Sequence, residues 1–284
     1  MVNINPNLKR GEELNQLSRL LFDSAAVKWY WAFLLELLAG IIALVFSLVR
    51  ELPDNLKIVT AAIGVVLIVT AYLLRQIFDD QYDMAETMRR QSVLTEGLGY
   101  DIKPVMFSEW RRRAGSRILS RFTVTPRNAD YYVTKKRSSP ARLLEMTQES
   151  AFWTRFLYSR LLELAKIPLI IFILIVLGVI LSIILGAIPT EIIPTLSYAV
   201  FLFIPIVITS NVIGWILKLR RLIASITEIE NDIDTLSRLS RVDAPSVLRL
   251  ISEYNCQVVS GFPIPSFVFK SEYSHIQDEW NKVH

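Results

Sequence analysis

The chain alternates long apolar runs with long polar stretches, a pattern that predicts membrane-spanning helices joined to water-facing segments. Its longest apolar region is 167–216, where Glu191 is the only charged side chain. Two runs of 19 and 21 residues, 167–185 and 196–216, flank a ten-residue break. At about 1.5 Å per residue, each run is long enough to cross a hydrocarbon core about 30 Å thick. Because backbone groups in lipid must be satisfied within the segment, we expect both runs to be helices.

Two further apolar runs come earlier in the chain, at 29–49 and 58–74, and the turn between them contains Pro53. The pattern therefore predicts an all-α membrane protein with four transmembrane helices arranged as two hairpins. The polar segment before them, 1–28, carries leucines at spacings of three and four residues. This spacing predicts a short amphipathic helix that leads into the first span.

The remaining polar stretches predict a helical cytoplasmic domain and long juxtamembrane helices. Segment 75–166 has 92 residues, the size of a small domain. It has no helix breaker before Gly97, so we expect the second span to continue as a polar helix and to end there. Ser139 followed by Pro140 indicates the start of a helix that reaches the third span. Segment 217–284 is expected to form a heptad helix and a helical tail.

Apolar residues beyond the fourth span follow steps of three and four residues, the spacing of a heptad seam. The candidate oligomer or helix-packing seam consists of Leu222, Ile226, Ile229, Ile233 and Leu236. Acidic side chains occupy the other faces of this helix. We therefore expect a partner helix against the seam, and a homo-oligomer is one way to supply it.

Composition and charge agree with a membrane protein that keeps large water-facing parts. The chain has 284 residues, of which 52% are hydrophobic and 20% are charged. Segment 75–166 holds 17 of the 31 lysines and arginines, whereas 186–195 holds none. The positive-inside rule then places the middle segment and both termini in the cytoplasm of a multi-pass protein.

Motifs of enzymatic chemistry are absent from the sequence. It contains no Walker loop, no Gly-x-Ser-x-Gly and no His-Glu-x-x-His. Cys256 is the only cysteine, and the two histidines, His275 and His284, have no neighbouring cysteines. We therefore expect no catalytic residues, no cofactor and no protein metal site.

A strongly basic stretch lies in the middle segment, with nine basic residues against one acid between Arg111 and Arg137. The candidate ligand-binding residues are Arg111, Arg112, Arg113, Arg117, Arg121, Lys135, Lys136 and Arg137. Arginine forks bind phosphates, and nearby aromatic rings offer stacking surfaces, so a nucleotide or another anionic ligand is one interpretation. The other is contact with anionic lipid heads, to which each charge contributes about 1 kcal/mol.

Polar residues inside the predicted spans fall at one depth, in the inner leaflet. The candidate pore or intramembrane polar cluster consists of Glu36, Thr70, Thr209, Ser210 and Asn211. An intramembrane carboxylate is costly unless it is paired, protonated or facing water, so it should face the bundle interior. Two interpretations follow. The cluster lines an ion path around an oligomer axis, or a protonated Glu36 bonds to Asn211 and fixes the packing.

Three local stretches carry a resemblance to a known family. They are QLSRLLFDSAAVKWYW at the entry to the first span, the helix with Ala141–Leu144, Gln148–Trp153 and Arg160, and the tail GFPIPSFVFK that begins at Gly261. Together with the order of two spans, an insert, two spans and a tail, they resemble the SMODS-associating four-transmembrane effector family. Members of this family are pore-forming proteins of bacterial anti-phage systems that signal through cyclic oligonucleotides.

The resemblance implies an effector of the bacterial inner membrane that disrupts the membrane of an infected cell, a form of abortive infection. Its activator would be a cyclic oligonucleotide made by a partner nucleotidyltransferase and bound on the cytoplasmic side. The expected partners are the lipid bilayer, this nucleotide and further copies of the chain, but no DNA or RNA polymer. The alternative is a non-conducting membrane scaffold that recruits a soluble partner through its heptad helix.

Overall fold

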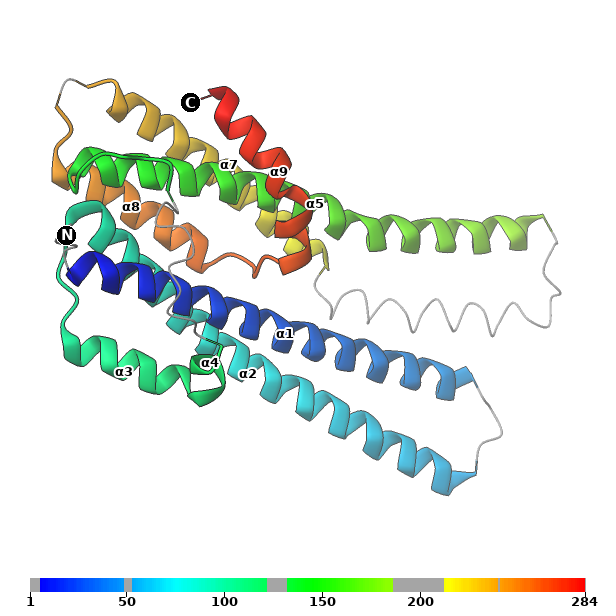
Figure 1. Ribbon diagram of the computed structural model, residues 1–284. Helices are drawn as coiled ribbons and strands as arrows, with labels where there is room; N and C mark the ends of the chain where they lie inside the picture. The colour runs from blue at the N-terminus through cyan, green and yellow to red at the C-terminus, as the bar shows by residue number, and fades with distance from the viewer. Residues whose placement is uncertain (1–5, 49–52, 122–131, 186–211, 240, 284) are drawn as a thin grey trace. The chain divides into compact units, whose positions relative to one another are not determined.

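The computed structural model describes residues 6–48, 53–121, 132–185, 212–239 and 241–283, and helices are the only regular elements in these ranges. The all-α prediction is therefore confirmed for the described residues. Four long helices dominate: α1 (Pro6–Leu48), α2 (Asp54–Leu98), α5 (Pro140–Ile184) and α7 (Val212–Ser237) (Figure 1). Four shorter helices accompany them: α3 (Pro104–Ala114), α4 (Ser116–Leu119), α8 (Ala244–Val259) and α9 (Ser266–Val283).

Within the described residues, two helices are long and apolar enough to cross a membrane, Arg10–Ala43 and Asn55–Leu98. The predicted third span, 167–185, forms the last part of α5, which ends at Ile184. Most of the predicted fourth span, 196–216, lies outside the described residues, and only its last residues appear, at the start of α7.

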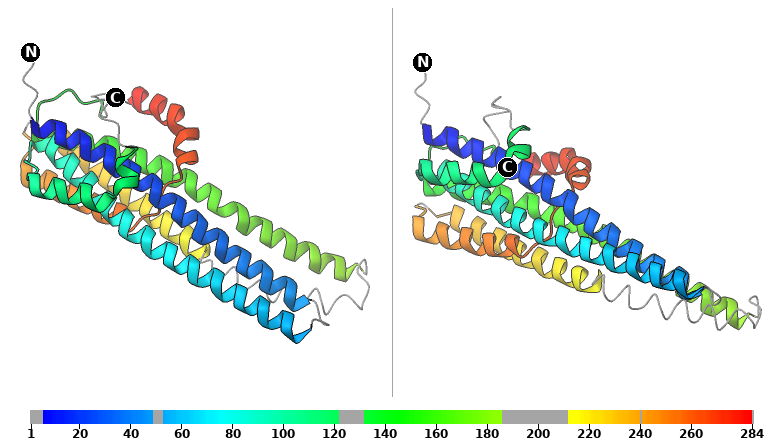
Figure 2. Two further views of the ribbon diagram at one scale, coloured as in Figure 1. Left: turned by 60° about the horizontal axis from the view of Figure 1, so that its bottom comes forward. Right: turned by 90° about the horizontal axis from the view of Figure 1, so that it is seen from below.

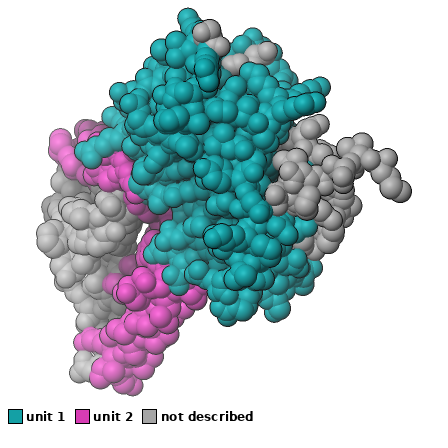
Figure 3. Space-filling view, turned by 90° about the vertical axis from the view of Figure 1, so that its left-hand side faces the viewer, with its two compact units in different colours: residues 1–27, 78–160, 220–284 teal, residues 28–77, 161–219 magenta. Residues whose placement is uncertain are grey.

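The chain divides into two compact units, coloured separately in Figure 3. One consists of Met1–Val27, Phe78–Arg160 and Arg220–His284, and we call it the helical domain. The other consists of Lys28–Ile77 and Leu161–Leu219, and we call it the apolar unit. α1, α2, α5 and α7 each have residues in both units, so no loop separates the units along these helices.

Local sequence explains where several helices begin and end. α2 ends at Leu98, and Gly99 follows with a φ of 77°, a left-handed conformation that favours glycine after a helix. α8 begins where Asp243 accepts a hydrogen bond from the Ser246 N–H at 3.0 Å, as an N-cap does. The end of α2 agrees with the position near Gly97 that the sequence predicts.

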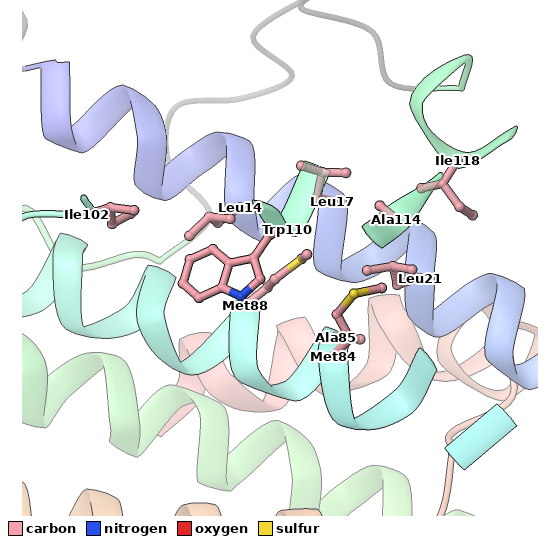
Figure 4. Close-up of a cluster of buried hydrophobic side chains, with 10 residues drawn as sticks. All are labelled: Leu14, Leu17, Leu21, Met84, Ala85, Met88, Ile102, Trp110, Ala114 and Ile118. Carbon is pink, nitrogen blue, oxygen red and sulfur yellow. The ribbon is translucent and has the colours of Figure 1, made fainter. Parts of the chain in front are cut away.

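One part of the helical domain's core holds the leucines of the predicted amphipathic segment. Leu14, Leu17 and Leu21 are fully buried against residues of α2, α3 and α4 (Figure 4). Their partners include Met88 of α2 and Trp110 of α3. The segment is not a separate short helix, because α1 continues from it without a break into the first apolar run.

The heptad seam of α7 is also buried within the chain. The exposed fractions of Leu222, Ile226, Ile229 and Ile233 are 5% or less, and Leu236 is half-buried. α7 runs beside α8 in both views of Figure 2. The partner helices that the seam requires are therefore helices of the same chain.

Aromatic side chains of the C-terminal helix α9 pack onto α5. Trp280 of α9 meets Phe152 with ring centroids 5.1 Å apart, and Tyr273 meets Trp153 at 5.4 Å. This contact joins the last helix of the chain to the start of the long helix α5.

Gly97 gives a test of the close packing between α2 and α5. A Cβ atom at this position would lie 2.9 Å from Leu143 Cβ and 3.1 Å from Leu143 Cα. We expect Gly97→Ala to lower the free energy of unfolding by about 1–3 kcal/mol, because a packed backbone must move. Circular dichroism during heating in detergent measures the effect.

Gly64→Ala is the matched control, because a Cβ there meets nothing within 4 Å. It should leave the melting temperature unchanged or raise it, since alanine favours the helix. Equal melting temperatures for Gly97→Ala and the wild-type chain would contradict the packing described here.

Candidate functional site

The carboxylate of Glu36 in the apolar unit is held by an arginine. Arg75 Nε donates to Glu36 Oε1 at 2.7 Å, and Arg75 Nη2 donates to Glu36 Oε2 at 2.6 Å. The two side chains come from neighbouring helices, Glu36 from α1 and Arg75 from α2. Within the described residues the carboxylate is therefore paired with Arg75, and the predicted contact with Asn211 lies outside those residues. The sequence argument missed Arg75 because it directly follows the apolar run and was counted with the cytoplasmic segment.

The other members of the predicted intramembrane cluster do not join this pair in the described structure. Thr70 is exposed, and its hydroxyl donates to the Val66 carbonyl of its own helix at 2.7 Å. Thr209, Ser210 and Asn211 lie outside the described residues. An equal depth in the sequence therefore did not bring Thr70 to Glu36.

An aromatic cluster near the start of the apolar part of α1 was not identified from the sequence. Trp29 meets Trp215 of α7 with ring centroids 5.2 Å apart, and Phe33 meets the same ring at 6.3 Å. All three residues belong to the apolar unit. The cluster packs the beginning of α7 against α1.

The arginine triplet 111–113 occupies the exposed last turn of α3, but carboxylates balance part of its charge. Arg112 donates to Glu109 in a bidentate pair at 2.8 and 2.7 Å. Arg113 lines a depression of about 210 Å³ together with Asp80 and Asp83 of α2. The surface around the triplet is therefore of mixed charge.

The other candidate ligand-binding residues lie on separate segments. Arg117 is on α4 and Arg121 follows it, and both are exposed. Lys135, Lys136 and Arg137 are exposed on the segment that leads into α5. The Lys136 ammonium pairs with Glu145 of α5 at 2.5 Å. The basic stretch therefore presents two groups of cations on different elements.

Two carboxylates on α5, one helical turn apart, hold the segment before this helix. Glu149 accepts a hydrogen bond from the Val133 N–H at 3.1 Å, and Glu145 accepts one from Thr134 at 2.5 Å. Burial raises the pKa of Glu149 from its ordinary value of 4.5 to about 7, and the Val133 N–H only partly offsets this effect. The sequence alone does not indicate this role, because Glu149 becomes buried only when the segment packs on α5.

A buried ionic network links α2 to α8 in the helical domain. Glu86 is almost fully buried and pairs with Arg89 at 3.0 Å and with Arg90 at 3.8 Å. Arg89 also donates to the Asn255 side chain at 3.0 Å, and Arg90 donates to the Asn255 carbonyl at 3.3 Å. Burial by itself would lower the pKa of Arg89, but the adjacent Glu86 carboxylate raises it above its ordinary value.

Further polar contacts join α5 to α7 and to α8. Arg155 of α5 pairs with Glu230 of α7 at 2.6 Å. The Tyr254 hydroxyl of α8 donates to the Ser150 carbonyl at 3.1 Å and lies 2.8 Å from the Thr154 hydroxyl. These contacts favour one register of the helices around α5, because the ion pair and the hydrogen bonds form only where the helices meet in that arrangement.

Within the described part of the chain, no group of three or more His, Cys, Asp and Glu side chains gathers as metal ligands would. Comparison with known proteins adds no relative: no family model, no curated protein and no solved structure matches this chain.

The raised pKa of Glu149 makes the stability of the helical domain depend on pH. A carboxyl group whose pKa is higher in the folded state stabilises that state below its unfolded pKa, near 4.5, and this contribution is lost as the pH rises through about 7. The full difference corresponds to about 3 kcal/mol, since one pKa unit is worth about 1.4 kcal/mol. We expect Glu149→Gln to remove this part of the pH dependence.

Chemical denaturation at a series of pH values between 4 and 8, about the range in which the group titrates, measures the effect. Glu253→Gln is the control, because Glu253 is exposed on α8. Burial also raises the pKa of Glu96 and Glu230, so some pH dependence of the same sign should remain in Glu149→Gln. A profile of Glu149→Gln identical to that of the wild-type chain would show that Glu149 ionises freely.

Proposed function

We propose that this protein is a four-span, pore-forming effector that permeabilises the bacterial inner membrane when a cyclic oligonucleotide binds its cytoplasmic side. The observation that carries the proposal is the continuity of the long helices. α1, α2 and α5 each run without a break between the polar helical domain and an apolar segment. Such helices can transmit a rearrangement of the domain to the apolar segments.

The outer surfaces of the apolar unit support a membrane location. Side chains such as Ile58 and Val66 on α2 and Leu174 on α5 are more than half exposed. Exposed apolar side chains along whole helices are disfavoured in water but suit lipid. With the apolar runs 167–185 and 196–216, the sequence supplies four spans, and the distribution of lysine and arginine puts both termini in the cytoplasm.

The signal in this proposal is an anion. The resemblance to the four-transmembrane effector family supports a cyclic oligonucleotide, and the two groups of exposed cations are its candidate contacts. Lys135 and Arg137 are favoured over Arg112 and Arg113, because the latter two lie beside carboxylates. Lys135 and Arg137 also lie just before the N-terminus of α5, where the helix dipole favours anions.

The scaffold alternative receives less support. It needs an exposed heptad seam for a soluble partner, whereas four of the five seam residues are buried within the chain. An effector does not need the seam to be exposed, because its output is permeability of the membrane. We therefore retain the effector as the proposed function.

Dye release from vesicles tests the proposal. The purified protein is inserted into vesicles of phosphatidylethanolamine and phosphatidylglycerol that contain a self-quenching dye, and cyclic dinucleotides and trinucleotides are added separately. We expect one of them to release the dye. Gln76→Pro, which interrupts α2 at an exposed position, should lower the ratio of nucleotide-stimulated to basal release roughly tenfold, since allosteric coupling is typically 1–3 kcal/mol.

Gln76→Ala is the matched control, because it keeps the helix intact, and it should release dye as the wild-type chain does. Absence of release with every cyclic nucleotide would contradict the proposed function. An equal ratio for Gln76→Pro and Gln76→Ala would show that helix continuity does not carry the signal.

Nucleotide binding to the detergent-solubilised protein tests the contact residues separately. We expect the double variant Lys135→Gln and Arg137→Gln to bind about tenfold more weakly, because a hydrogen bond to a charged group contributes about 1.5–3 kcal/mol. Replacement of Arg111, Arg112 and Arg113 by glutamine should have a smaller effect. Calorimetric titration measures both affinities, and an unchanged affinity in both variants would remove the basic stretch from the binding site.

A further inference from the structure

The Glu36–Arg75 ion pair is a charged contact between α1 and α2 inside the apolar unit. Glu36 is the only acidic residue between Asp23 and Glu51, and Arg75 is the first basic residue after Lys57. The side chains are 38% and 31% exposed, so the pair lies at the edge of the helix contact with apolar side chains on either side.

The geometry of the pair specifies one register of the two helices. Both carboxylate oxygens receive hydrogen bonds from two guanidinium nitrogens, at 2.7 and 2.6 Å. Two parallel bonds between planar groups tolerate little displacement. Sliding one helix by a single residue moves it by about 1.5 Å and turns its side chains by about 100°, which breaks the fork.

The side chains described around Glu36 do not replace Arg75 as a partner of its carboxylate. The Thr70 hydroxyl is bonded to the Val66 carbonyl, and apolar side chains precede and follow Glu36 on α1. A carboxylate that loses its partner in lipid must take up a proton or find water. The ion pair therefore favours a packing of α1 and α2 with no water between them. In a packing that admits water, the carboxylate can be hydrated, and the ion pair no longer favours one arrangement.

Arg75 is well placed to respond to the helical domain. From Arg75, α2 continues without a break to Glu86, Arg89 and Arg90, which bind Asn255 of α8 directly or through each other. A rotation or translation of α2 that begins in the domain therefore also moves Arg75 relative to Glu36. Single helices transmit such movements as discrete changes in packing.

We propose that the Glu36–Arg75 ion pair is a latch that holds the α1–α2 hairpin in a non-conducting packing, and that opening requires the pair to break. Arg75 is then a positioning residue, which acts by holding Glu36. This inference rests on the proposed function, and it differs from the interpretation in which Glu36 itself lines the ion path. In the latched state, the carboxylate is neutralised within its own chain.

Dye release without any nucleotide tests the latch in vesicles of phosphatidylethanolamine and phosphatidylglycerol. We expect Glu36→Gln and Arg75→Gln each to raise the basal release about tenfold, since conformational equilibria of this kind differ by a few kcal/mol. The charge-swapped double variant Glu36→Arg with Arg75→Glu should restore low basal release, because it re-forms an ion pair. Arg75→Lys should give intermediate release, because lysine keeps the charge but not the fork.

Lys166→Gln is the matched control. It removes the ion pair with Glu163 at 2.6 Å, which lies within α5 and does not join two helices. We expect its basal release to equal that of the wild-type chain. Circular dichroism of each variant identifies any that fail to fold, and the swapped double variant and Arg75→Lys then decide the outcome.

Two results would overturn the latch. In the first, Glu36→Gln lowers the nucleotide-stimulated release while Arg75→Gln leaves the basal release unchanged, which would place Glu36 in the conducting path. In the second, the wild-type chain releases dye with a nucleotide, but neither single variant raises the basal release. If no nucleotide and no variant releases dye, the proposed function fails, and the latch fails with it.

Discussion

Main-chain hydrogen bonding within single helices is the interaction on which the rest of the structure depends. In lipid every N–H and C=O must be paired inside its own segment, and a helix that satisfies this requirement has no reason to stop at the membrane surface. α1, α2 and α5 contain 43, 45 and 45 residues, and each combines a polar and an apolar part without a break. The domain and the apolar segments therefore share the same helices.

Charged side chains act differently in the two units. In the helical domain, Glu86 is buried and pairs with Arg89 and Arg90. In the apolar unit, Glu36 has a single described partner, Arg75. Buried ion pairs add little net stability over apolar contacts, but removing one partner is costly. Such pairs therefore select one arrangement among several of similar stability, and they are suitable components of a switch.

The structure weakens two of the functional interpretations, recruitment of a partner protein and ligand binding at the arginine triplet. A free heptad seam would have favoured recruitment of a partner protein, but Ile226 and Ile233 are fully buried in the chain. An undivided basic surface would have favoured a ligand site at the arginine triplet, but Glu109 pairs with Arg112, and Asp80 and Asp83 line a depression together with Arg113. The cations before α5 become the stronger candidates, because they lie close to the start of a helix that continues into an apolar segment.

The sequence by itself determined the helical class, the long apolar runs and several helix ends, such as Gly99 after α2 and Ser139 before α5. These features depend on neighbours within a few residues, through hydropathy, capping and the conformational freedom of glycine. Only the tertiary structure decided that Arg75 holds Glu36, that the seam of α7 is covered by the same chain, and that Glu149 is buried. These features depend on where helices distant in sequence cross, and a side chain's partner or burial is fixed only by that crossing.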